Sequence, residues 1–89
     1  MEKERKELLD IILKIKKLNF LEQFLKDLLT PKEYKEIVKR WQIVKQLSDK
    51  VSQWQIGDNL KVSRSKITRG SRVLYSKNSA FNKILGKKK

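Results

Sequence analysis

Apolar residues recur every three or four positions along much of the chain, and this spacing constrains the fold more than any other feature. It runs through residues 8–18, 20–28 and 34–47, with a break that we place at Asn19. Such spacing puts the apolar side chains on one face of a helix. The sequence therefore predicts an all-α protein, with Trp41 in its core. The positions that form the pattern are Leu8, Ile12, Ile15, Leu18, Phe20, Leu21, Phe24, Leu25, Leu28, Tyr34, Ile37, Val38, Trp41, Val44 and Leu47.

Three sites carry residues that cap the start of a helix. Thr30 and Glu33 have the spacing of a capping box, and the proline between them suits the first helical position. Ser52 and Gln55 repeat the spacing of the box. Ser63 offers a capping hydroxyl but has a lysine three residues later, so it is expected to cap without forming a full box. We expect a helix to begin directly after each site.

The last two caps define a helix-turn-helix. They predict helices at residues 53–60 and 64–74, joined by three residues, which is the connection length of this motif. Gly57 is interpreted as the small residue needed where the two helices cross. The apolar wedge between the helices is expected to consist of Ile56, Leu60, Val62 and Ile67. The motif is predicted to occupy residues 52–74.

The second helix of this motif has one polar face. At 100° per residue, Ile67, Gly70 and Leu74 fall on the opposite, inward face. Arginine can form paired hydrogen bonds to guanine, and serine or threonine can bond to any base edge. The polar face is therefore expected to enter the major groove of DNA, although a merely solvated helix face is the alternative. Its residues are Arg64, Ser65, Thr68 and Arg72.

Positive charge is concentrated at one end of the chain. Of the net charge of +13, residues 59–89 contribute ten basic residues and no acid. This asymmetry favours a polyanionic partner, of which double-stranded DNA is preferred over a membrane surface. Gln53 is also expected to contact the DNA. The residues expected on the DNA backbone are Lys61, Lys66, Arg72, Lys77 and the tail Lys87 to Lys89.

The residue types that are missing exclude several classes of protein. Histidine and cysteine are both absent, which removes the usual general base, the commonest metal ligands and any disulfide. We therefore expect neither an enzyme nor a metal protein. The longest uninterrupted apolar run is Ile11-Ile12-Leu13, far shorter than the roughly 20 residues of a membrane span. Without a leader-like segment, a cytoplasmic location is expected.

Blocks of this sequence resemble the tryptophan repressor family over residues 28–74. The order and spacing of the blocks agree, with one short deletion near Lys50. The resemblance implies an intertwined helical homodimer that binds operator DNA with L-tryptophan as co-repressor. The matching blocks are Leu29-Thr30-Pro31, Arg40, Ile43-Val44, Ser52-Gln53 and Ile67-Thr68-Arg69-Gly70-Ser71.

The resemblance also implies a ligand pocket. Arg40 and Arg69 match the two arginines that sandwich the indole ring in that family, and stacking of a guanidinium on an aromatic ring is physically apt. One position departs from the family, because Val73 stands where a serine lies near the amino group of the ligand. The remaining residues implied to line the pocket are Leu29, Thr30, Val44 and Gly70.

These predictions combine into one DNA-binding domain over residues 1–89. Residues 1–48 are expected to form dimerisation helices, because their apolar stripes are too extensive for one short chain to cover. Residues 52–74 form the helix-turn-helix, and 75–89 a basic C-terminal helix and tail. The predicted function is that of a homodimeric, sequence-specific repressor that responds to a small indole or amino-acid ligand. Two alternatives are a ligand-independent regulator of the same fold and a sequence-tolerant nucleic-acid-binding protein.

Overall fold

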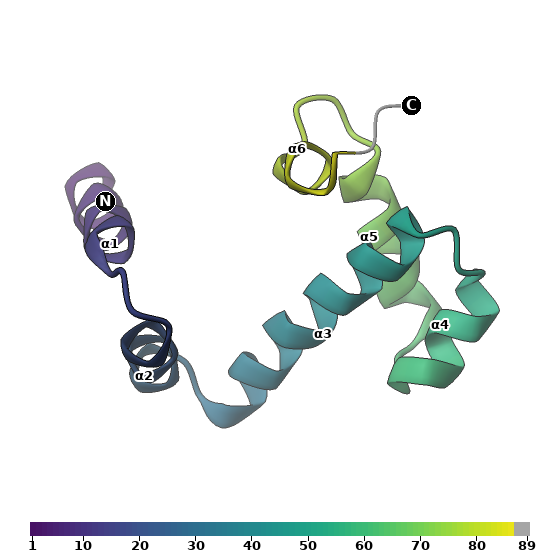
Figure 1. Cartoon of the computed structure of the whole chain (residues 1–89), viewed down its shortest axis with the longest axis horizontal. Coiled ribbons are helices and arrows are strands. Elements are labelled where there is room, and N and C mark those ends of the chain that lie inside the picture. Colours follow the sequence, from purple (N-terminus) through teal and green to yellow (C-terminus); the bar gives the residue numbers. More distant parts are fainter. Residues whose placement is uncertain (87–89) are drawn as a thin grey trace. The chain divides into compact units, whose positions relative to one another are not determined.

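The computed structural model describes residues 1–86 and confirms the all-α prediction. No strand occurs in this part of the chain. The helices are α1 (Glu2–Lys14), α2 (Leu18–Leu28), α3 (Pro31–Ser48), α4 (Gln53–Leu60), α5 (Arg64–Leu74) and α6 (Ala80–Leu85) (Figure 1).

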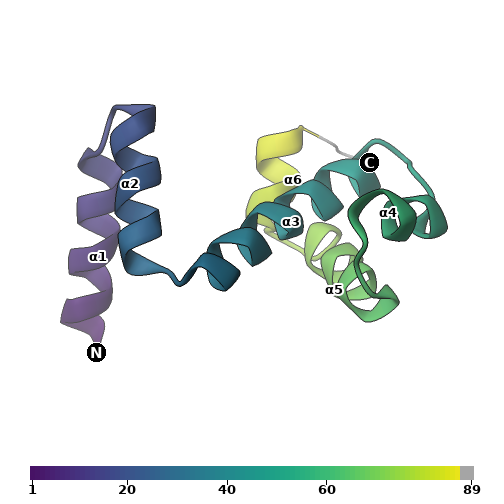
Figure 2. The same cartoon turned by 90° about the horizontal axis from the view of Figure 1, so that it is seen from below.

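The chain divides into two compact units, Met1–Tyr34 and Lys35–Lys89. In the first unit, α1 and α2 run in opposite directions (Figure 2). The break between them lies at residues 15–17, where Ile15 and Lys17 have extended backbone. The predicted break at Asn19 is wrong, since Asn19 lies in the first turn of α2. Asparagine favours helix starts over helix interiors, so it is acceptable there.

The first unit leaves its apolar side chains uncovered. Neither α1 nor α2 contains a fully buried residue. Leu13 and Leu18 are each about four-fifths exposed, and Phe20 and Leu28 are more than half exposed. Helices with such apolar faces gain little stability from this unit by itself, because burial of apolar area is the main driving force of folding.

The start of α3 is fixed by the predicted capping box. The hydroxyl of Thr30 accepts from the backbone N–H of Glu33 at 3.1 Å, and the carboxylate of Glu33 accepts from the N–H of Thr30 at 2.9 Å. Within the same unit, the hydroxyl of Tyr34 donates to Glu22 of α2 at 3.1 Å. The bond from Tyr34 joins the first turn of α3 to the middle of α2.

The second unit contains the hydrophobic core. In this unit, α5 crosses the C-terminal half of α3, with α4 and α6 at its two ends (Figure 1). Trp41 is half-buried rather than central, and its ring packs on that of Phe81 with centroids 5.9 Å apart. Ile37 and Val38 of the predicted apolar stripe remain exposed. The fully buried apolar residues are Ile43, Val44, Leu47, Ile56, Ile67 and Leu74.

The helix-turn-helix has the predicted bounds. The hydroxyl of Ser52 accepts from the N–H of Gln55 at 3.1 Å, and that of Ser63 accepts from the N–H of Lys66 at 3.3 Å. Only the hydroxyl half of the box at Ser52 is formed, and the side-chain amide of Gln55 donates to Asn59 of the same helix. A local hydroxyl cap is therefore sufficient to start each of the two helices.

The C-terminal segment forms a short helix that packs on the core. The hydroxyl of Ser79 caps α6 by accepting from the N–H of Asn82, and the Asn82 side chain donates to the carbonyl of Leu74 at the end of α5. Phe81 and Leu85 are half-buried against the core. The predicted C-terminal helix is thus present over Ala80–Leu85.

Candidate DNA-binding surface and ligand pocket

The turn between α4 and α5 has the predicted length. Lys61 adopts a left-handed conformation with φ of 55°, and the N–H of Val62 donates to the carbonyl of Gly57 at 3.3 Å. Ile56 and Ile67 are fully buried, while Leu60 and Val62 pack against the core from its edge. The predicted wedge therefore holds the two helices together.

The role predicted for Gly57 is wrong. A Cβ built on Gly57 would lie 3.5 Å from the carbonyl oxygen of Val62 and 3.6 Å from Cδ1 of Ile67, which are ordinary contacts. The close approach occurs at Gly70, where a Cβ would lie only 2.9 Å from Cγ2 of Ile43. The glycine that packing requires is thus the one between α5 and α3.

The four residues predicted to face the major groove lie on the outer face of α5. Arg64, Ser65, Thr68 and Arg72 are all exposed, whereas the opposite residues of the helix are buried. No acidic residue occurs at residues 59–86, so this part of the described chain carries positive charge alone. The face therefore combines hydrogen-bonding groups for base edges with an electrostatic attraction for phosphate.

The residues predicted on the DNA backbone divide into three groups. Lys61, Arg72 and Lys77 are exposed, and Lys61 has only a loose ion pair with Asp58 at 3.9 Å. Gln53, which was predicted to contact the DNA, is exposed as well. Lys66 is directed elsewhere, since its ammonium bonds to Glu36 of α3 at 3.0 Å. The tail Lys87 to Lys89 lies outside the described residues.

Sequence reasoning assigned no role to Trp54. This side chain is 74% exposed in the first turn of α4. It lines a shallow groove between α4 and α5 together with Arg64. The available signal was its position two residues before Ile56, which puts it off the apolar face of the helix. Trp54 is therefore an apolar group beside the polar recognition face.

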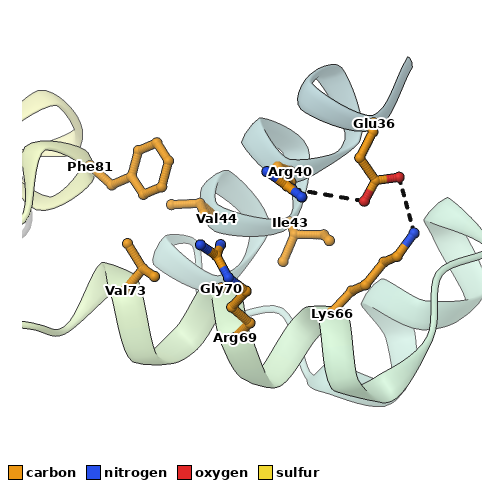
Figure 3. Close-up of a pocket in the computed structure, with 9 residues that line it drawn as sticks. All are labelled: Glu36, Arg40, Ile43, Val44, Lys66, Arg69, Gly70, Val73 and Phe81. Carbon is orange, nitrogen blue, oxygen red and sulfur yellow. Dashed lines mark hydrogen bonds and ion pairs between the residues drawn. The ribbon is translucent and has the colours of Figure 1, made fainter. Parts of the chain in front are cut away.

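A pocket of about 330 Å³ lies between α3, α5 and α6 (Figure 3). Five of the predicted ligand residues line it: Arg40, Val44, Arg69, Gly70 and Val73. Sequence reasoning missed the other four lining residues, which are Glu36, Ile43, Lys66 and Phe81.

Two of the predicted pocket residues are not among those that line it. Leu29 and Thr30 belong to the first unit, and Thr30 caps α3. All nine residues that line the pocket belong to the second unit.

Glu36 is the electrostatic centre of the pocket. Its carboxylate bonds to the Lys66 ammonium at 3.0 Å and lies 3.8 Å from Nε of Arg40 (Figure 3). The bond from Lys66, with the nearby positive charges, holds the pKa of Glu36 below its ordinary value. Glu36 is therefore ionised at neutral pH and links α3 to α5.

The arrangement of α4 and α5, with its three-residue turn and exposed basic face, defines the helix-turn-helix class of DNA-binding proteins. Within that class, the chain belongs to the family of the Trp repressor protein, whose pattern matches residues 3–89. This is a family of DNA-binding transcriptional regulators and not of enzymes. No curated protein matches the chain.

None of the helices in residues 1–86 is both long and apolar enough to cross a membrane. The same residues contain no cluster of acidic side chains that could hold a metal ion.

Proposed function

We propose that this protein is a homodimeric, sequence-specific repressor that binds operator DNA through α5 and responds to a small ligand held between α3 and α5. The observation that carries the proposal is the exposed face of Arg64, Ser65 and Thr68 on a capped recognition helix, in a chain of the Trp repressor family. In this proposal, these three side chains contact base edges in the major groove.

Contacts with phosphate supply most of the affinity and little of the specificity. We assign them to Lys61, Lys77 and Arg72, with Gln53 near the start of α4 as an uncharged donor. Lys66 would have to leave Glu36 before it could reach the DNA, so we assign it to the pocket.

The second copy of the chain would cover the apolar helices of the first unit. Two observations support such a dimer. Neither α1 nor α2 contains a fully buried residue, and Ile37 and Val38 on α3 are exposed. A two-fold axis would place the two recognition helices about 34–36 Å apart, one turn of DNA. Light scattering tests this part, since a compact monomer of 10.6 kDa with a cooperative melt would contradict it.

The ligand would act by favouring one spacing of the two recognition helices. It can do so only if it binds that arrangement more tightly than the other. The pocket is suited to this role because α5 forms one of its walls and also carries the DNA-binding face. An indole compound such as L-tryptophan is the first candidate, and Val73 supports the alternative of a regulator that needs no ligand.

The decisive experiment selects binding sites from a random pool of duplex DNA, with and without L-tryptophan or another indole compound. We expect an enriched palindromic site with half-sites one helical turn apart, and stronger enrichment when an effective ligand is present. Equal binding to unrelated duplexes and to RNA would indicate the sequence-tolerant alternative. Enrichment that no ligand changes would indicate the ligand-independent regulator.

A further inference from the structure

Trp54 is the most exposed large apolar side chain in residues 35–86, with 74% of its surface open to solvent. It lies in the first turn of α4, two residues before Ile56, which is fully buried. The indole therefore points away from the core that α4 helps to form. A tryptophan offers a large, rigid apolar surface, and most of this surface is left for a partner to cover.

The indole forms one wall of a shallow groove between α4 and α5. Arg64, the first residue of α5, also lines this groove, and Val62 and Ile67 add apolar surface to it. Gly57 lines it as well and has no side chain to fill it. The groove therefore places an aromatic ring, a guanidinium and small apolar groups along one strip of the surface.

The groove is continuous with the proposed DNA-binding face. Arg64 belongs both to the groove and to the exposed polar face of α5. In helix-turn-helix proteins, the N-terminal residues of the recognition helix contact base edges, while the preceding helix crosses the DNA backbone. Trp54 stands beside this end of α5, so a duplex that Arg64 contacts also comes against the indole.

The charges of the groove do not favour a phosphate. Among the described residues that line it, Arg64 and Asp58 are the charged ones, and their charges cancel. Phosphate contacts depend on a local excess of positive charge. A neutral, apolar group is therefore the better occupant, and the 5-methyl group of thymine is the apolar feature that base pairs display in the major groove.

We propose that Trp54 is a specificity-determining residue, which packs against the 5-methyl group of a thymine next to the base pair that Arg64 contacts. The inference rests on the proposed sequence-specific DNA binding and names one base feature that this binding reads. It adds an apolar contact from α4 to the hydrogen bonds from Arg64, Ser65 and Thr68. An indole ring and a methyl group form no hydrogen bond, so the selectivity comes from apolar area removed from water.

Replacement of single thymines by deoxyuridine tests the proposal on the full chain. Uracil keeps every hydrogen-bonding group of thymine and lacks only the 5-methyl group. In the duplex enriched from the random pool, each thymine is replaced in turn, and binding is measured by titration at one salt concentration. We expect one position in each half-site to lose about fourfold in affinity, or about 0.8 kcal/mol, the value of one buried methyl-sized group.

Two variants connect this loss to the indole. Trp54→Ala should bind the thymine and uracil duplexes equally, because it removes the surface on which the methyl group packs. Thr68→Ala is the matched control, since Thr68 is exposed on the base-facing side of α5 but is not among the residues that line the groove. It should weaken binding to both duplexes and keep the fourfold ratio. Trp54 is exposed, so alanine, the best helix former, is expected to leave α4 intact, which a thermal melt of the variant checks.

The outcomes separate this proposal from the proposed function. An enriched site in which no thymine is sensitive to uracil would overturn the role of Trp54 and leave a sequence-specific regulator standing. A fourfold loss that persists in Trp54→Ala would also overturn it, since another residue would then contact the methyl group. Absence of any enriched duplex would overturn the proposed sequence-specific binding, and the thymine contact with it.

Discussion

A Cβ atom built on Gly70 would lie 2.9 Å from Cγ2 of Ile43, so α5 approaches α3 closely enough to require glycine at this position. Gly70→Ala must therefore displace Ile43, which is almost completely buried. We expect the free energy of unfolding to fall by about 1–2 kcal/mol, as the cost of overpacking exceeds the gain in helix propensity. Urea denaturation at fixed protein concentration measures the change.

Gly57→Ala is the matched control. It makes the same substitution inside α4, where the new Cβ would meet only ordinary contacts of 3.5 and 3.6 Å. Alanine should raise the free energy of unfolding by about 0.5–1 kcal/mol, because glycine is unfavourable inside a helix. Equal effects of the two substitutions would contradict the close packing at Gly70.

Ser48 presents a buried hydroxyl near the end of α3. The side chain is 2% exposed, and its oxygen has no hydrogen-bond partner in the described part of the chain. An unpaired buried polar group costs about 1–3 kcal/mol, so Ser48→Ala should stabilise the protein by roughly 1 kcal/mol. Thermal melts of the variant and the parent at equal concentration test this. A loss of stability would show that the hydroxyl has a partner, such as a bound water or a second chain.

Features that depend on neighbouring residues were predictable from the sequence. Ser52 and Ser63 fixed the starts of α4 and α5 because a capping hydroxyl acts on an N–H only three residues away. The inward face of α5 followed from helical spacing in the same way.

Features that depend on long-range approach were not predictable. Glu36 and Lys66 are thirty residues apart, and nothing near either residue indicates that they meet. The need for a small residue was assigned to Gly57 and missed at Gly70 for the same reason. A glycine in the sequence does not reveal which helix packs against it. Both the ion pair between Glu36 and Lys66 and the requirement for glycine at position 70 arise from the packing of α5 on α3.

Arg64 and Thr68 are expected to determine DNA specificity. Replacing either with alanine should cost about 1–3 kcal/mol of discrimination against the wrong base. Lys77→Ala should instead weaken binding to all sequences alike and reduce the salt slope by about one unit. Titrations of the selected site and of mutated sites over a range of salt concentrations separate these effects. A larger change of sequence preference in Lys77→Ala than in Arg64→Ala would contradict the assignment of the recognition surface to α5.

Trp54 is expected to be covered by DNA. It is one of two tryptophans, so Trp41→Phe leaves its fluorescence as the sole tryptophan signal. Addition of the selected duplex should change the intensity and wavelength of that signal, while Trp54→Phe, which retains Trp41, should respond much less. Trp54→Ala should lower DNA affinity by up to about 1.5–3 kcal/mol, the value of burying a large apolar side chain. A signal from Trp54 that changes with protein concentration before DNA is added would assign it to a protein interface.

Val73 provides a direct test of how the pocket discriminates between ligands. It lines the pocket one turn after Arg69, where the family has a serine near the ligand amino group, and it offers no hydrogen-bond acceptor. Val73→Ser should strengthen L-tryptophan binding by about 0.5–1.5 kcal/mol, the net value of one hydrogen bond. Indole-3-propionate lacks the ammonium and should gain nothing, so calorimetry with both compounds isolates the new contact. Val73→Ala is the control for the lost methyl groups, because it reduces the side chain without adding a hydroxyl. An equal gain for both ligands in Val73→Ser would mean that extra space, and not an acceptor for the ammonium, controls binding at this position.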